Sequence, residues 1–258
     1  MSGRTQGPGG ATVAVLSLKG GVGKTTLTLG LAGAAWAAGQ PVVVVDLDPQ
    51  ANATYALDPH PFDFTVHDVL WDGRPGIAAQ AFTASAWGAG VRILAAEPAL
   101  IDRGQRTLGA ISRLRVALEG AVPPGTLVVI DCPPTLGELT RNALQAASTA
   151  LIVAEASRFG VDAAIRAVSA VEQARESTNP GLHVAGVVVN RVRAGQRQRW
   201  LAELTAALPG RVVPFTIPDV AAVADLQEAR LPVQAWPAHD SHELTGAFEE
   251  LYRAVTGG

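Results

Sequence analysis

The stretch LSLKGGVGKTTLTLGLA, Leu16 to Ala32, contains the only two lysines of the 258-residue chain, Lys19 and Lys24. The other 18 basic residues are arginines. An apolar, β-branched run (12–18) leads into this glycine-rich loop, and a helical pattern (25–38) follows it. In a chain that otherwise uses arginine, two lysines in one loop indicate a chemical requirement.

The strand–loop–helix order predicts a phosphate-binding loop. Gly20, Gly21 and Gly23 let successive backbone N–H groups converge on an anion, and the helix N-terminus adds partial positive charge. Lys24 is predicted to contact the β- and γ-phosphates, and the Thr25 hydroxyl is predicted to bind Mg²⁺. The alternative, a glycine-rich turn that simply starts a helix, explains neither lysine.

Composition and pattern predict one α/β domain with a mostly parallel sheet covered by helices on both faces. The predicted strands are continuous apolar runs, as expected of buried parallel strands; they are 12–18, 41–47, 91–97, 126–131, 150–156 and 183–190. The helical patterns between them are 25–38, 103–119, 139–147, 161–176, 196–208, 220–229 and 243–256, with a short helix near 66–70 inside an irregular insertion. We expect a disordered tail over 1–11 and a P-loop NTPase-like domain over 12–258.

The single cysteine excludes a disulfide framework and a CxxC metal site, which fits a reduced, cytoplasmic setting. We find no signal peptide at the N-terminus and no apolar run long enough to span a membrane.

Two further strands end in carboxylates. Asp46 and Asp48 follow the strand in VVVVDLDPQ, and Asp131 ends the strand in TLVVIDCPP. Ligands of open parallel sheets bind at the carboxyl ends of the strands, so these acids are expected at the site. Asp-Pro is also good turn chemistry, which is the competing interpretation of Asp48.

The loop departs from the strict Walker A pattern because Leu18 occupies the first glycine position and Lys19 follows it. In this respect the chain resembles the deviant Walker A ATPases of the ParA/Soj and MinD superfamily. The resemblance implies an ATP-bound homodimer in which Lys19 contacts the partner's phosphates while Lys24 serves its own nucleotide. It also implies that Asp46 belongs to the Mg²⁺ network, that Asp48 orients the attacking water, and that Asp131 is the Walker B acid.

The same resemblance places Asn190, at the end of GVVVNR, on the adenine, and Pro218 in the loop over the base. The expected catalytic residues are Lys19, Lys24 and Asp48. The expected nucleotide-binding residues are Lys19, Gly20, Gly21, Val22, Gly23, Lys24, Thr25, Thr26, Asn190 and Pro218. The expected metal ligands are Thr25, Asp46 and Asp131, and the cofactors are ATP and Mg²⁺.

Relatives of this type bind DNA non-specifically and respond to a stimulating partner, which implies a ParB-like or other adaptor and a nucleoid-associated location. The candidate DNA residues are four clustered arginines, Arg191, Arg193, Arg197 and Arg199, which could neutralise phosphates. Against this, the segment after Ile217 lacks the basic residues common in the family. An acidic C-terminal segment (241–258) argues against binding to an anionic membrane.

Three functions remain open at this stage. The first is a ParA-like ATPase that partitions or positions a plasmid, a chromosome region or other cargo. The second is a nucleotide switch whose cargo is not DNA. The third, a biosynthetic amidoligase of the same superfamily, fits least well because such enzymes usually lack the Lys19-type lysine.

Overall fold

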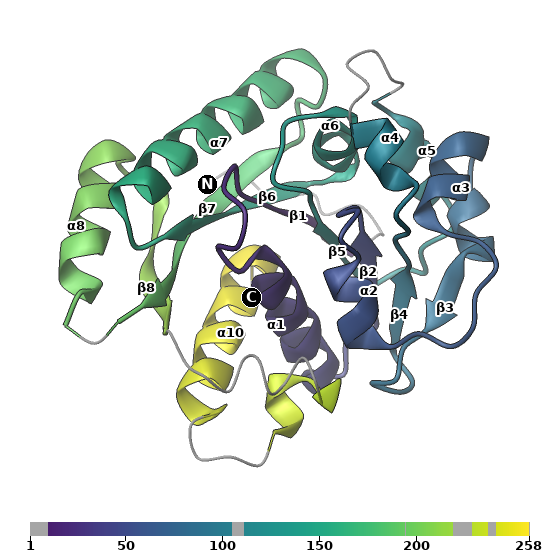
Figure 1. The fold of residues 1–258 in the computed structure, drawn as a ribbon, viewed down its shortest axis with the longest axis horizontal. Coiled ribbons are helices and arrows are strands. Elements are labelled where there is room, and N and C mark those ends of the chain that lie inside the picture. Colours follow the sequence, from purple (N-terminus) through teal and green to yellow (C-terminus); the bar gives the residue numbers. More distant parts are fainter. Residues whose placement is uncertain (1–9, 105–110, 194, 219–228, 237–240, 258) are drawn as a thin grey trace.

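The computed structural model describes residues 10–104, 111–193, 195–218, 229–236 and 241–257 (Figure 1). Within them, the strands are β1 Thr12–Leu16, β2 Val42–Asp46, β3 Phe82–Ala84, β4 Val91–Leu94, β5 Leu127–Asp131, β6 Thr149–Glu155, β7 His183–Val192 and β8 Val212–Pro218. The α-helices are α1 Lys24–Ala37, α2 Asn52–Leu57, α3 Val66–Asp72, α4 Leu100–Gly104, α5 Arg113–Leu118, α6 Glu138–Ala146, α7 Arg158–Ser177, α8 Arg197–Ala207 and α10 Ser241–Thr256. Two short 3₁₀ turns, η1 Ile77–Gln80 and η2 Val233–Ala235, complete the described elements.

The strands form one sheet in the order β3-β4-β2-β5-β1-β6-β7-β8. Every neighbouring pair is parallel except β3 and β4, which are antiparallel at one edge. The predicted α/β class with a mostly parallel sheet is therefore confirmed.

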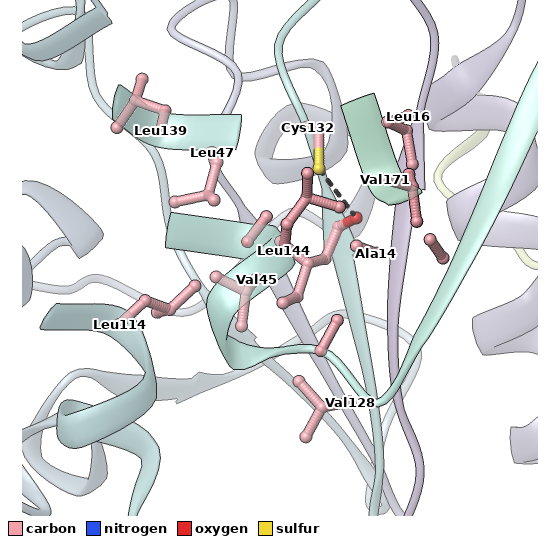
Figure 2. Packing of buried hydrophobic residues seen from close by; sticks show 14 of the residues in the cluster. Ala14, Leu16, Val45, Leu47, Leu114, Val128, Cys132, Leu139, Leu144 and Val171 are labelled. Atoms are coloured by element: carbon pink, nitrogen blue, oxygen red, sulfur yellow. Dashed lines mark hydrogen bonds between the residues drawn. The ribbon is translucent and has the colours of Figure 1, made fainter. Parts of the chain in front are cut away.

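Both faces of the sheet are buried, as the continuous apolar strands require. Alternate residues of β1 point to opposite sides: Ala14 and Leu16 join one apolar cluster, and Val13 and Val15 join the other. Helices α1 and α10 lie side by side over the second face, while α6 and α7 cover the first (Figure 1). Figure 2 shows part of the first cluster, where the Cys132 thiol lies among leucines and valines.

Cys132 is fully buried, and burial raises the pKa of its thiol, so the thiolate is disfavoured. Its Sγ points back to the Ile130 carbonyl (Figure 2). The sequence gives it no nearby histidine, and the structure places it in the apolar core, as a small packing residue.

The register of the sheet decides which side chains meet at its carboxyl edge. Strand β1 lies between β5 and β6, and the loop that follows β1 therefore emerges at the centre of that edge. Asp46 of β2 pairs in register with Asp131 of β5. On the other side, Glu155 of β6 pairs with Asn190 of β7.

Several elements differ from the sequence prediction. Strands β3 and β8 were not expected, and the helix predicted over 103–119 corresponds to two helices, α4 and α5, on either side of residues outside the described part. Residues 220–228 of the helix predicted over 220–229, and most of the predicted tail (residues 1–9), also lie outside the described residues. Ala11 already belongs to the sheet region, since its carbonyl accepts a hydrogen bond from the Val128 N–H at 2.9 Å.

The packing of α10 on α1 depends on Gly30. A Cβ atom at this position would lie 2.2 Å from the ring of Phe248, which is almost fully buried. Gly30→Ala is therefore expected to lower the free energy of unfolding by about 1–3 kcal/mol, measured by urea denaturation. Gly246→Ala, in α10 with open space around the added methyl, is the matched control and should raise stability by about 0.5–1 kcal/mol. Equal effects of the two substitutions would contradict this account of the α1–α10 contact.

Candidate ATP-binding site

The glycine-rich loop after β1 adopts the backbone that only glycine takes easily. Gly21 has φ 72° and Gly23 has φ 92°, and α1 begins directly afterwards at Lys24. No side chain caps this helix, and its first turn holds no acidic residue. The first-turn N–H groups therefore keep their capacity to bind an anion, as the sequence predicts.

Gly23 is required for a second reason, because another part of the fold touches it. A Cβ atom there would lie 2.0 Å from the side-chain nitrogen of Asn190. That nitrogen donates a hydrogen bond to the Val22 carbonyl at 2.7 Å, and Asn190 is 2 % exposed. The end of β7 thus packs directly against the loop.

Three aspartates converge beside the start of α1. The Thr25 hydroxyl donates to Asp131 Oδ2 at 2.6 Å, which ties the loop to the end of β5. Asp46 and Asp131 are fully buried neighbours, and Asp48 is nearly buried. The extended strand ends at Asp46; beyond it the Asp48 N–H donates to Asp46 Oδ1 at 3.1 Å. The predicted residues Lys24, Thr25, Asp46, Asp48 and Asp131 therefore lie together.

Burial and mutual repulsion shift the titration of this cluster. Burial, only partly offset by hydrogen bonds from Thr54, raises the pKa of Asp46 to about 6. Burial, followed by the charge of Asp46, raises the pKa of Asp131 to about 8, although Thr25 and the Lys24 ammonium oppose the shift. Two carboxyl groups this close cannot both ionise easily unless positive charge compensates them.

This donor set fits Mg²⁺. The ion prefers oxygen ligands such as carboxylates, hydroxyls and phosphates, and usually retains several waters. The Thr25 hydroxyl and the Asp46 and Asp131 carboxylates provide such oxygens, and burial raises the pKa of both acids. A divalent cation would favour the ionised form of both acids.

Lys19 and Lys24 lie in different environments. Lys24 is 6 % exposed and acts electrostatically on Asp131, whereas the Lys19 side chain is 38 % exposed at the rim of the loop. The Lys19 ammonium forms an ion pair with Glu155, at the end of β6. This ion pair, and then a hydrogen bond from the Ser157 hydroxyl, lower the pKa of Glu155.

The predicted arginines do not share one environment. Arg191 donates from Nη1 to the Gly21 carbonyl at 2.6 Å. Arg197 and Arg199 lie at the start of α8, where Arg199 pairs with Glu203 at 3.1 Å and stacks over the Trp200 ring. Arg193 lines a cavity of about 450 Å³ together with Arg191 and Glu155.

The expected contacts of Asn190 and Pro218 with the adenine base of ATP remain predictions. Asn190 is in contact with the loop, and Pro218 ends β8, where its backbone pairs with Val192 of β7. Both positions therefore lie at the same edge of the sheet as the phosphate loop.

Sequence reasoning missed two polar residues of the site. Thr54 donates to Asp46 Oδ2 through both its N–H, at 2.9 Å, and its hydroxyl, at 2.8 Å, and so orients that carboxylate. Glu155 pairs with Lys19. A signal existed for Glu155, since an acid ends a buried strand, the same pattern that marks Asp46 and Asp131.

The raised pKa of Asp131 makes stability depend on pH. An acid whose pKa is higher in the folded than in the unfolded chain stabilises the fold fully below pH 4, and this contribution is lost as the pH rises toward 8. Without nucleotide or Mg²⁺, the free energy of unfolding should fall by about 1 kcal/mol per pH unit from this group between pH 5 and 7. Asp131→Asn should remove that part of the slope in urea titrations. Identical slopes for the two proteins would contradict the assignment.

The Lys19–Glu155 ion pair can be tested because the chain has only two lysines. Glu155→Gln should raise the rate at which an amine-reactive ester labels Lys19 in the nucleotide-free protein, roughly two- to fivefold, as expected for the loss of a partly exposed ion pair. The rate is read by peptide mass spectrometry, with buried Lys24 as internal reference. Glu119→Gln, which removes the exposed Arg115–Glu119 pair instead, should leave Lys19 labelling unchanged.

Among the described residues, no helix is both long and apolar enough to cross a membrane.

Comparisons with known proteins agree with this geometry. A family model described as an AAA domain matches residues 10–184. The chromosome partitioning protein ParA of Caulobacter vibrioides is 36% identical over 185 residues, which cover 69% of this chain and 68% of that protein.

Two solved structures share the fold. A Cyanothece McdA–ATP complex aligns with a TM-score of 0.83 at 21% identity, covering 96% of this chain and 97% of the other. Cobyrinic acid a,c-diamide synthase from Mycobacterium smegmatis, with bound ADP and magnesium, aligns with a TM-score of 0.71 at 26% identity, covering 86% and 92%. With the family model spanning most of the domain and a relative more than one-third identical, the chain belongs to the ParA/MinD superfamily of P-loop ATPases.

Proposed function

We propose that this protein is a ParA-type ATPase that dimerises with ATP and uses hydrolysis to ADP and phosphate to control non-specific DNA binding. The cargo would be a plasmid, a chromosome region or another body to be positioned. The observation that carries the proposal is the contrast between the two loop lysines. Lys24 is buried beside the carboxylates of its own site, whereas Lys19 lies at the exposed rim.

The loop and α1 would bind the triphosphate of their own subunit. The N–H groups of the loop and of the first turn provide donors, and the Lys24 ammonium places a positive charge beside them. Thr25, Asp46 and Asp131 would hold Mg²⁺, which neutralises developing charge on the phosphates when bound. Thr54 keeps the Asp46 carboxylate in a fixed orientation.

Asp48 would orient the attacking water. Its Oδ1 accepts a hydrogen bond from the Gln50 N–H at 3.0 Å, which fixes one oxygen of the carboxylate. Phosphoryl transfer depends mainly on positioning and charge stabilisation, so one held carboxylate can serve this role. We expect turnover to be slow until a ParB-like or other adaptor completes the site.

Lys19 would act in the partner's site. A partly exposed ammonium at the rim can reach across a twofold interface, which a buried one cannot. The similarity to the partition protein ParA supports membership of the family. The dimer of this chain is part of our proposal. A location at the nucleoid would follow from DNA binding by the ATP form.

Two alternatives stand beside this proposal. The first is a switch for a cargo other than DNA, which is favoured by the lack of lysine and arginine over residues 218–226 of the sequence. The second is a biosynthetic enzyme, suggested by the likeness to a cobyrinic acid diamide synthase. Salt-dependent DNA retention of the ATP form would argue against the first. ATP hydrolysis that needs no carboxylate substrate or nitrogen donor would argue against the second.

The central test compares Asp48→Ala with wild type. The variant should bind ATP normally, hydrolyse it at least about a hundredfold more slowly, and accumulate as a dimer in size-exclusion chromatography with light scattering. Lys24→Ala should lose ATP binding in a direct titration. Asp63→Ala, an exposed aspartate away from the site, should behave like wild type.

Normal turnover by Asp48→Ala would mean that another group positions the water. A wild-type protein that binds ATP and Mg²⁺ yet remains monomeric at every concentration would refute the dimer and with it the trans role of Lys19.

A further inference from the structure

Two adjacent side chains at the end of β7 hold two consecutive carbonyl groups of the phosphate loop. Asn190 Nδ2 donates to the Val22 carbonyl at 2.7 Å, and Arg191 Nη1 donates to the Gly21 carbonyl at 2.6 Å. A loop whose N–H groups converge on an anion must turn its carbonyl groups elsewhere, where they need donors. Strand β7 supplies these donors.

The backbone of Arg191 is unusual in a way that accompanies this contact. Its φ is 56°, a left-handed conformation that costs free energy for a residue with a Cβ atom. The register between β7 and β8 shifts between Val189 and Val192, on either side of it. Glycine or asparagine would occupy such a position more easily, so an arginine in this conformation suggests that its side chain has a role there.

The positive charge of Arg191 also acts on an acidic group of the site, Glu155. This charge contributes to lowering the pKa of Glu155, after the larger effects of Lys19 and Ser157. Arg191 and Glu155 line the same cavity of about 450 Å³ at the rim of the loop. Arg199, by contrast, engages Glu203 and Trp200 on its own helix.

We propose that Arg191 is a positioning residue of the phosphate loop, and that its contribution is to ATP affinity rather than to DNA contact. The inference rests on the proposed function only in that the loop binds ATP. The guanidinium fixes the Gly21 peptide, and this fixes the direction in which the N–H groups of the loop point.

The experiment uses three variants of the full chain: Arg191→Ala, Arg191→Gly and Arg199→Ala. ATP affinity is measured by direct titration in the presence of Mg²⁺, and stability by urea denaturation. Loss of the charge-assisted hydrogen bond that the exposed Arg191 side chain donates should weaken ATP binding by about tenfold in both Arg191 variants. Arg199→Ala should stay within about twofold of wild type.

The glycine variant separates positioning from folding. Glycine accepts the left-handed backbone without strain, so Arg191→Gly should be more stable than Arg191→Ala. The two variants should nevertheless lose ATP affinity equally, because both lack the guanidinium. Recovery of affinity in Arg191→Gly would show that the loss came from backbone strain and would overturn the proposal.

DNA retention at saturating ATP supplies the second readout. It should change little in Arg191→Ala and fall in Arg199→Ala if α8 contacts DNA. Unchanged ATP affinity together with reduced DNA retention in Arg191→Ala would overturn the proposal and show that Arg191 contacts DNA. A wild type that binds ATP but never DNA would remove the DNA part of the proposed function and leave the ATP titrations as the decisive result.

Discussion

The placement of two fully buried carboxylates in neighbouring strands is the constraint on which the site depends. Asp46 and Asp131 are register partners in β2 and β5, so the sheet itself holds their charges together. The fold compensates with hydroxyl donors from Thr25 and Thr54 and with a buried ammonium on Lys24. The pKa values of both acids remain raised, because burial outweighs these hydrogen bonds and the nearby ammonium. A divalent cation bound here would favour the ionised form of both acids.

Much of this architecture could be predicted from residues alone. Six strands are continuous β-branched runs, and the acids at their ends predict which edge carries the chemistry. Strand β3 was missed because it is a three-residue antiparallel edge strand inside an irregular segment. Strand β8 was missed because VVPFTIP contains two prolines, which weaken any strand pattern. In both cases tertiary pairing, and not local sequence, decides the structure.

The site was predictable where one strand end supplies one group, and was not where two distant segments meet. Lys24, Thr25 and the aspartates follow from motifs, because a motif fixes the loop and its strand. The contact of Arg191 with Gly21 depends on a left-handed residue just beyond the predicted strand (183–190), which no local pattern indicates. The pairing of Lys19 with Glu155 depends on the order of β1 and β6 in the sheet, which the sequence does not state.

The contact between α1 and α10 has a consequence for how the protein is made. Helix α1 begins at the phosphate loop, yet the ring that fills the space over Gly30 comes from Phe248, more than two hundred residues later. During translation the ribosome has to add more than two hundred residues after Gly30 before this face of α1 can be covered. Contacts of such long sequence separation form late and slowly. The nascent polypeptide therefore carries an uncovered apolar helix beside its nucleotide loop until Phe248 has been made, and a chaperone would be of most use to it during that interval.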